Sequence, residues 1–407
     1  MSTQPVNASQ SAAADSSWGE VLRVFLKLGL TSFGGPIAHL GYFRTEFVER
    51  RKWLDEKTYA DLVALSQFLP GPASSKVGIA VGFFRAGYVG ALISWAGFTL
   101  PSALALVLFA YGVDALGGAL GSGWLHGLKV VAVAVVAQAV LGMMRSLAPD
   151  RARATVAVIA AVIVLWFPTA WGQIAAIVFG FGAGLTVLHI DAPHDHVSLP
   201  VRVSRITGAI LLALFFVILV GLPLLTAVYP AHALKVFEAF YRAGSLVFGG
   251  GHVVLPLLQA SVVPTGWVSN DAFLAGYGAA QAVPGPLFTF AAYLGAVMGP
   301  QPNGWGGAAL CLVAMFLPAF FLTLGALPFW DDLRRRPWAQ SALRGVNAAV
   351  VGLLLAALYN PVWTAGITNA YDFALAVAAF LLLFMWQLPP WLVVILSAVG
   401  GAAIAHL

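Results

Sequence analysis

Long apolar runs recur along the whole chain, separated by shorter polar stretches, and they predict helices that cross a membrane. Examples cover residues 88–111, 125–144, 207–228 and 306–329. A helix needs about 20 apolar residues to cross the roughly 30 Å hydrocarbon core of a bilayer, and each of these runs reaches that length. No stretch between the runs is long enough for a separate soluble domain. The pattern therefore predicts an all-α polytopic membrane protein.

The chain contains two related halves. Residues 53–72 align without a gap on residues 267–286, with five identical pairs that include both Pro-Gly-Pro triplets. A Phe-Gly-Gly triplet precedes each copy, at residues 33–35 and 248–250. Because these matches occur in the same order in both halves, the sequence indicates an internal duplication.

The duplication divides the chain into four parts. We expect a disordered cytoplasmic tail over residues 1–19, a first membrane repeat over 20–190, a linker with one membrane helix over 191–230, and a second membrane repeat over 231–407. The tail lacks the basic segment and the short apolar core of a secretory signal peptide. The single cysteine, Cys311, lies in an apolar run, which excludes disulfides and thiolate metal sites.

The distribution of charge predicts how the halves are oriented. Charged residues make up only 9% of the chain, against roughly 25% in soluble domains, so lipid must cover most of its surface. Loop Lys and Arg residues, which mark the cytoplasmic side of a membrane protein, supply most of the net charge of +5. The loop over residues 46–57 carries four of them, whereas the equivalent loop over 261–271 carries none. Equivalent loops thus face opposite sides, which predicts inverted-topology repeats.

This sidedness follows most simply if the segments broken at the two triplets enter the membrane and return to the same side as re-entrant helical hairpins. Proline lacks an amide hydrogen and glycine has no side chain, so both triplets break helices. A half-helix that starts after a break directs its free N–H groups, and the positive end of its dipole, at the break. Inverted-repeat transporters bind substrate at such breaks near the bilayer midplane. The backbone contacts expected for an anion are Gly34, Gly35, Gly71, Gly249, Gly250 and Gly251.

The residues after the first Pro-Gly-Pro triplet are strong donors. Ser74, Ser75 and Lys76 place two hydroxyls and an ammonium on the first helical turn. These groups suit a tetrahedral dianion, and a lysine at membrane depth is costly without a role. The alternative is that Lys76 extends to the membrane interface. In the second half Thr289 is the hydroxyl residue after the triplet, so the first half is expected to meet the charge of the anion.

Two histidines and two glutamines also lie beside the breaks. His39 and His252 follow the Phe-Gly-Gly triplets. Either can donate to an oxyanion or titrate during proton coupling, and a structural histidine with ordinary hydrogen bonds is the alternative. Gln67 and Gln281 come three residues before the Pro-Gly-Pro triplets. Their amides either contact the substrate or satisfy carbonyls that the helix break leaves free.

Four charged residues are candidates for gating or for support of the site. Arg85 can act as a gate or a second anion contact, or can simply set the topology. Arg44 and Glu46 are expected to pair with each other at the mouth of the first hairpin, unless both lie in a solvated loop. Lys129 stands about one turn into an apolar helix, where it either supports the gate or extends to the interface.

No motif favours an enzyme or an ATP-driven pump. The sequence has no Walker loop, haem motif or catalytic triad. His189, His194 and His196 form a short histidine-rich stretch, but it lies in a loop without a second ligand cluster. We therefore expect neither a metal nor a cofactor.

The run from Ser32 to Gly87, SFGGPIAHLGYFRTEFVERRKWLDEKTYADLVALSQFLPGPASSKVGIAVGFFRAG, resembles the chromate ion transporter (CHR) family, as do FGGGHVVLPLLQ at 248–259 and QAVPGP at 281–286. The resemblance covers essentially the whole chain. It implies a multi-pass exporter in the bacterial inner membrane, of the long two-domain type, which gives chromate resistance and uses the membrane potential or the proton motive force.

The resemblance leaves the anion itself open. The alternative cargo is sulfate or another tetrahedral oxyanion, carried by an importer or by a chromate/sulfate antiporter. The partners we expect are the chromate anion, sulfate as its analogue, the lipid bilayer and a second copy of the chain in a homodimer. Nucleic acid is not among them.

Overall fold

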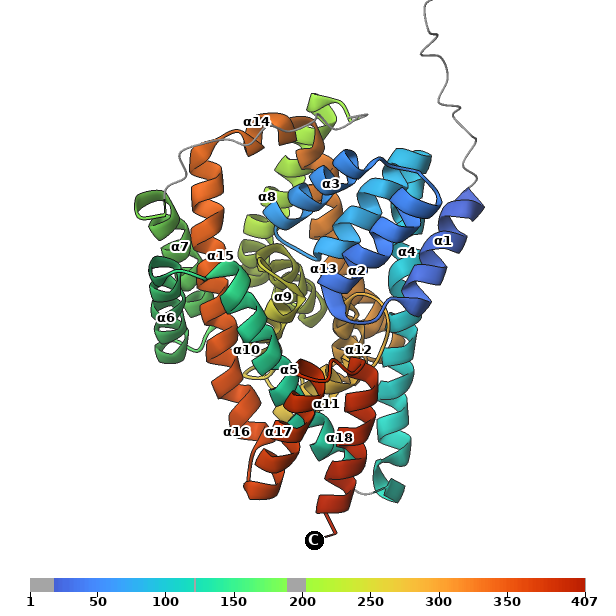
Figure 1. Ribbon diagram of the computed structural model, residues 1–407, viewed down its shortest axis with the longest axis vertical. Helices are drawn as coiled ribbons and strands as arrows, with labels where there is room; N and C mark the ends of the chain where they lie inside the picture. Colours follow the sequence, from blue (N-terminus) through green and yellow to red (C-terminus); the bar gives the residue numbers. More distant parts are fainter. Residues whose placement is uncertain (1–17, 121, 189–202, 407) are drawn as a thin grey trace, which may run out of the picture.

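The computed structural model describes residues 18–120, 122–188 and 203–406, and within these ranges it is built from helices without a β-strand. The expected N-terminal tail up to residue 17 and the histidine-rich stretch lie outside the described residues. Figure 1 shows an elongated bundle with α14 at one end and the C-terminus at the other. The start of α1 lies toward the α14 end. The all-α fold predicted from the sequence is confirmed.

The helices of the first half and the linker follow the predicted order. They are α1 (Trp18–Thr31), α2 (Gly35–Arg44), η1 (Thr45–Arg50), α3 (Glu56–Phe68), α4 (Ala73–Leu120), α5 (Gly123–Leu147), α6 (Arg151–Trp166), α7 (Ala170–Thr186) and the linker helix α8 (Arg205–Val228).

The second half repeats this series. Its helices are α9 (His232–Leu246), η2 (Gly251–Val253), α10 (Val254–Val262), α11 (Asn270–Ala280), η3 (Leu287–Thr289), α12 (Phe290–Val297), α13 (Gly304–Ala326), η4 (Leu327–Phe329), α14 (Trp330–Arg334), α15 (Pro337–Ala357), η5 (Leu358–Trp363), α16 (Thr364–Gly366), α17 (Ala370–Phe384) and α18 (Pro390–Ile404).

Both halves contain the hairpins that the triplets predict. In Figure 1 α1 descends from the α14 end to the Phe-Gly-Gly break, and α2 returns to the same end. Helix α4 is broken at Ala86 and at Gly87, whose φ is +65°. Gly82 therefore packs against Gly90 and Ser94 beyond the break. The first part of α4 thus completes a second hairpin with α3, and only the remainder runs the length of the bundle. Figure 1 places the equivalent α10, α11 and α12 toward the opposite end.

Reciprocal backbone hydrogen bonds join the two halves at their breaks. The N–H of Gly71 donates to the carbonyl of Val247 (2.7 Å), and the N–H of Gly285 donates to the carbonyl of Ser32 (2.8 Å). These are equivalent positions, because each donor is the glycine of one Pro-Gly-Pro triplet and each acceptor precedes the Phe-Gly-Gly triplet of the other half. Both glycines have a positive φ, +103° and +90°, which other residues adopt only with strain.

The helix pair that closes each half packs on the long helix of the other half. Helices α6 and α7 contact α15, whereas α17 and α18 contact α5. Gly127 on α5 and Gly345 on α15 are equivalent positions, and they pack directly against Gly401 and Gly180 respectively. Small residues let membrane helices approach closely and gain dispersion contacts, because lipid supplies no hydrophobic drive between helices. The closing helix pairs are therefore exchanged between the halves.

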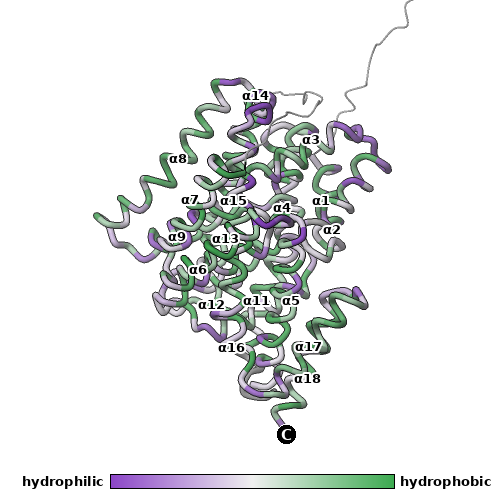
Figure 2. Tube along the Cα trace, turned by 60° about the vertical axis from the view of Figure 1, so that its left-hand side comes forward, coloured by the Kyte–Doolittle hydropathy of each residue, from purple (hydrophilic) through white to green (hydrophobic). Residues whose placement is uncertain are grey.

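Exposed apolar surface agrees with a membrane environment. Hydrophobic residues run along α8, α17 and α18, and hydrophilic residues gather at the end that carries α14 (Figure 2). Within the described chain, five helical segments are long and apolar enough to cross a membrane: Ala73–Val113, Gly123–Leu147, Arg205–Val228, Gly304–Arg334 and Pro337–Gly366.

We predict that Glu49 and Thr265 face opposite sides of the membrane. Both positions are exposed, and the native Cys311 is fully buried. Single-cysteine variants Glu49→Cys and Thr265→Cys, made in a Cys311→Ala background, should therefore differ in labelling by a membrane-impermeant thiol reagent applied to intact cells. Thr265→Cys should react, and Glu49→Cys should react only after the cells are lysed. Equal accessibility of the two positions would contradict the inverted topology.

We predict that Gly285→Ala destabilises the protein more than Gly266→Ala. Both glycines have a positive φ, +90° and +72°, so alanine costs about 1–2 kcal/mol of backbone strain at either position. At Gly285 the new Cβ would also lie 3.1 Å from the carbonyl oxygen of Phe98, whereas at Gly266 it meets nothing within 4 Å. Overpacking should add about 1–3 kcal/mol. Thermal unfolding in detergent measures the difference, and equal melting temperatures would contradict a tight junction at Gly285.

Candidate functional site

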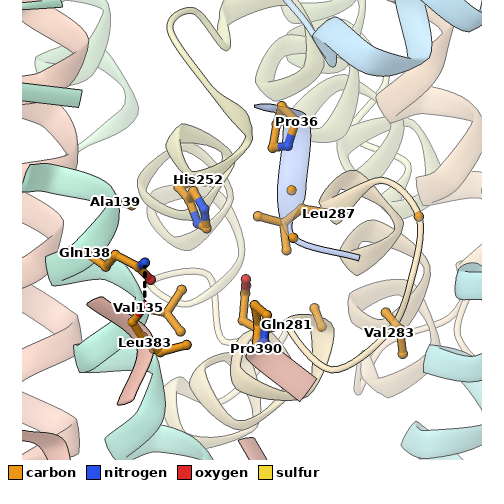
Figure 3. Close-up of a pocket in the computed structure, with 14 residues that line it drawn as sticks. Pro36, Val135, Gln138, Ala139, His252, Gln281, Val283, Leu287, Leu383 and Pro390 are labelled. Atoms are coloured by element: carbon orange, nitrogen blue, oxygen red, sulfur yellow. Dashed lines mark hydrogen bonds between the residues drawn. The ribbon is translucent and has the colours of Figure 1, made fainter. Parts of the chain in front are cut away.

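A cavity of about 190 Å³ lies where the breaks of the two halves meet. A buried water needs roughly 15 Å³ by this measure, so the space is large enough for several waters or a small polyatomic ion. Figure 3 shows side chains from both halves facing it. The first half contributes Gly34, Gly35, Pro36, Val135, Gln138 and Ala139, and the second contributes His252, Ala280, Gln281, Val283, Gly285, Leu287, Leu383 and Pro390.

Two half-helices begin at this cavity from opposite directions. Helix α2 begins at Gly35, after Gly34 with a φ of +95°. The η2–α10 segment begins at Gly251 in the second half, and a Cβ on Gly251 would lie 3.4 Å from Cγ of Pro36. The first N–H groups of a helix have no partner within it, and they carry the positive end of its dipole. The cavity is therefore placed at a positive end of the first-half hairpin, beside its counterpart in the second half.

Three polar side chains that face the cavity are held by the protein. Nδ1 of His252 lies 2.7 Å from the hydroxyl of Tyr277, and Nε2 of Gln281 donates to the Tyr277 carbonyl (3.3 Å). Nε2 of Gln138 donates to the carbonyl of Leu383 (3.4 Å; Figure 3). When the Tyr277 hydroxyl donates to Nδ1, Nε2 of His252 carries the proton and can donate in turn. These contacts fix the side chains and leave polar atoms for a bound ion.

No Lys, Arg, Asp or Glu residue lines the cavity. Lys76 instead lies fully buried beside the end of α3. Its Nζ donates to the carbonyl of Leu69 and to that of Pro70 (3.0 Å). These carbonyls end α3, where the helix dipole favours a positive charge. Lys76 therefore does not extend to an interface, and its direct contact with an anion stays a prediction.

The structure brings only part of the expected set to the cavity. Gly34, Gly35, His252 and Gln281 line it. The remaining candidates lie elsewhere: Ser74 lies 3.3 Å from His39, Ser75 is buried, Thr289 donates to the Pro286 carbonyl (2.8 Å), Gly71 donates to Val247, Gly249 and Gly250 form the second turn, Gly251 adjoins Pro36, and Gln67 is exposed.

Arg44 and Glu46 do not pair with each other, contrary to one of the two interpretations of the sequence. Arg44 pairs with Glu49 and with Glu56 (2.8 Å), and Glu46 pairs with Arg51 (2.8 Å) and also with Lys27 and Arg50. The reason is geometric, because residues two apart on a helix do not face each other. Burial raises the pKa of Glu46, but hydrogen bonds from Arg51 and Lys27 outweigh it and hold the pKa below its ordinary value.

Two of the other expected gating residues have defined contacts. The guanidinium of Arg85 lies 4.8 Å from the centre of the Trp53 ring, a cation–π arrangement that holds it at the first hairpin. Nζ of Lys129 lies 3.0 Å from Oδ1 of Asp271. This ion pair joins α5 of the first half to α11 of the second.

A larger vestibule of about 570 Å³ opens around the Lys129–Asp271 pair. It also contains His126, whose Nε2 lies 2.8 Å from Oδ1 of Asp372. At the α14 end, a buried ion pair joins the halves instead, with Nη1 of Arg334 at 2.6 and 2.7 Å from the two carboxylate oxygens of Asp61. The ends therefore differ: one is closed by a buried pair, and the other opens into the vestibule.

Sequence reasoning missed several of these residues, although signals were present. Gln138 is a polar residue inside an apolar run, and Asp372 is an acidic residue at the start of an apolar helix. Asp61 and Arg334 lie far apart in the sequence, so nothing local indicated their pairing. Among the described residues, no group of three or more His, Cys, Asp or Glu side chains is placed to hold a metal.

Comparisons with known proteins agree with this arrangement. The chain is 27% identical over 392 residues to a probable chromate transport protein of Synechococcus elongatus, with 94% of each chain covered. It is 29% identical to the chromate transport protein of Pseudomonas aeruginosa, covering 83% of this chain and 79% of the relative. The protein of that name from Cupriavidus metallidurans is 25% identical, with 83% and 81% covered.

No solved structure matches the chain significantly. The profile of the chromate transporter family, however, matches residues 19–185 and again residues 234–402. These two matches fall on the two structural repeats and cover most of the chain. The relatives are transporters rather than enzymes. The chain belongs to the chromate transporter family.

Proposed function

We propose that this protein is a secondary transporter that exports chromate from the cytoplasm across the bacterial inner membrane and so confers chromate resistance. The observation that carries the proposal is the cavity between inverted halves, which adjoins the start of α2. The names of the relatives support chromate as the cargo. The arginine-rich end that carries α14 is the cytoplasmic end in this proposal.

The membrane potential is sufficient to drive export of a dianion. Moving one charge through 100 mV is worth about 2.3 kcal/mol, so a dianion that leaves an inside-negative cell gains about 4.6 kcal/mol. At about 1.4 kcal/mol per factor of ten, this sustains a gradient above roughly a thousandfold. Export therefore requires no ATP, whereas uptake of the same anion would require a co-transported cation.

The lining of the cavity suits a transported ion. Helix dipoles, amides and an imidazole provide donors without a fixed positive charge. An anion held in this way is compensated but not trapped, because no full ion pair has to be broken for its release. Alternating access requires the cavity to open to each end in turn. The Asp61–Arg334 pair is the inner gate in this mechanism, and the Lys129–Asp271 pair is the outer one.

The alternative is a transporter of sulfate or another tetrahedral oxyanion, including a chromate/sulfate antiporter. The same observation favours it, since donors around a cavity recognise charge and shape, which sulfate and chromate share. We treat a second copy of the chain as a partner only within this proposal.

We predict that purified protein in liposomes releases trapped chromate and that an inside-negative potential, set with potassium and valinomycin, accelerates the release. The reason is the charge of the dianion. Protein-free liposomes are the control. Sulfate added outside should leave the initial rate unchanged for a uniporter and raise it for an antiporter. Chromate release no faster than from empty liposomes, together with rapid sulfate flux, would contradict chromate as the cargo.

We predict that Gln138→Leu raises the half-saturating chromate concentration about tenfold, because it removes a hydrogen-bond donor from the cavity while keeping most of the volume. The matched control is Gln259→Leu. Gln259 lines a separate cavity of about 40 Å³, so this change should leave the half-saturating concentration unaltered. Equal effects of the two substitutions in the flux assay would show that the amide of Gln138 does not contact the anion.

A further inference from the structure

Three buried hydroxyls in the core of the first half have no hydrogen-bond partner among the described residues. They belong to Ser32, Ser75 and Thr99, whose exposed fractions are 0%, 2% and 0%. A buried hydroxyl without a partner destabilises a folded protein by about 1–3 kcal/mol. Such groups are few in native structures, and an unplaced water or ion is a common explanation.

The three hydroxyls lie in one region around His39. Nδ1 of His39 is 3.3 Å from Oγ of Ser74, the neighbour of Ser75. Nε2 of His39 lies near the Ser32 backbone without completing a hydrogen bond of ordinary geometry. The ring of His39 stands edge-on to Phe98, the neighbour of Thr99, with ring centres 5.4 Å apart.

The packing within α4 places Ser75 level with Thr99. Gly82 packs on Gly90 and Ser94 across the break in α4. Two helical turns, about seven residues, back from Gly82 is Ser75. Two turns beyond the other side of this contact lie residues 97–101, with Thr99 at their centre. The hydroxyls of Ser75 and Thr99 therefore belong to the same layer of the bundle.

This region adjoins the cavity through Gly285. The N–H of Gly285 donates to the Ser32 carbonyl, and a Cβ on Gly285 would lie 2.9 Å from Oγ of Ser102. Gly285 itself lines the cavity. The polar region is thus separated from the cavity by one glycine, on the side of the hairpins that lead to the α14 end.

The second half fills the equivalent space with aromatic rings. Phe288 and Phe316 occupy the positions of Ser74 and Thr99, and their ring centres are 6.0 Å apart. The repeat therefore shows that these two positions face each other, and that the first half has small hydroxyl side chains where the second half has two phenyl groups. The other equivalents are Val247 for Ser32, Val254 for His39 and Thr289 for Ser75.

The donors in this region suit an anion better than a cation. Helix α4 begins at Ala73, so the positive end of its dipole is directed at the region. The carbonyls of Leu69 and Pro70, which a cation would need, already accept from Lys76. None of the hydrogen bonds described for Ser32, Ser75 or Thr99 goes to a carboxylate.

We infer that Ser32, His39, Ser74, Ser75 and Thr99 form a second binding position for the transported oxyanion, inside the first half and on the cytoplasmic side of the cavity. The inference rests on the proposed function. In this arrangement the anion moves from the hydroxyls of the first half to the interface cavity and then to the vestibule. The second half offers no equivalent position, because its aromatic rings occupy the space.

Thr99→Val tests the inference, because valine keeps the shape of threonine and removes the hydroxyl. The matched control is Thr323→Val, which removes another fully buried hydroxyl without a described partner, in α13 of the second half. In anion-free protein, both variants should unfold at the same or a higher temperature than wild type, because each removes an unsatisfied group. A merely structural role therefore predicts the same behaviour for both.

Chromate separates the two variants. Thr99→Val should raise the chromate concentration for half-maximal thermal stabilisation about fivefold to tenfold, and should raise the half-saturating concentration for flux in the same direction. Thr323→Val should match wild type in both measurements. A Thr99→Val protein that responds to chromate like the control would overturn the inference.

Two further outcomes have defined meanings. If Thr99→Val changes only the response to sodium, measured against choline at fixed chromate, the region binds a cation and the inference is wrong. If wild-type protein responds to sulfate but not to chromate, and Thr99→Val weakens the sulfate response, the second position holds while chromate as the cargo fails.

Discussion

The structure depends on the need to satisfy backbone polar groups where helices are broken inside a membrane. Without water, an unpaired N–H or carbonyl costs several kcal/mol, so irregular backbone at this depth persists only when the protein itself supplies partners. Here each half supplies them to the other: Gly71 donates to Val247, and Gly285 donates to Ser32. The breaks that create a place for an ion are thus stable only in the assembled pair of halves, and the cavity lies at their junction.

On this symmetric frame the chemistry is unequal. At the breaks, the first half carries hydroxyls, an imidazole and the fully buried Lys76, whereas the second half carries mainly aliphatic and aromatic side chains. The two ends differ as well, since the buried Asp61–Arg334 pair closes one and the Lys129–Asp271 pair stands in an open vestibule at the other. A duplicated scaffold gives two equivalent routes to the centre. The substitutions make them distinct, as directional transport requires.

The sequence predicted the repeat, its inversion and the hairpins because these depend on local properties: apolar length, loop charge, and the conformations of Gly and Pro. It also indicated four of the residues that line the cavity, because helix breaks were the expected site. It could not identify the partner of Lys76, since a lysine near a triplet is compatible with an anion, an interface or a helix end. Contacts between distant segments, such as Asp61 with Arg334 and Gln138 with Leu383, depend on tertiary packing and have no local signature.

The exchange of closing helix pairs bears on how such a protein is made and how it arose. Helices α6 and α7 emerge from the ribosome long before α15, on which they pack, so the first half must remain incompletely assembled in the membrane until nearly the whole chain has been inserted. The same exchange restricts the ancestry of the fold. A single-repeat chain could form these contacts only with a second copy inserted in the opposite direction, so a dual-topology dimer is the natural precursor, and gene fusion would then fix one copy in each orientation.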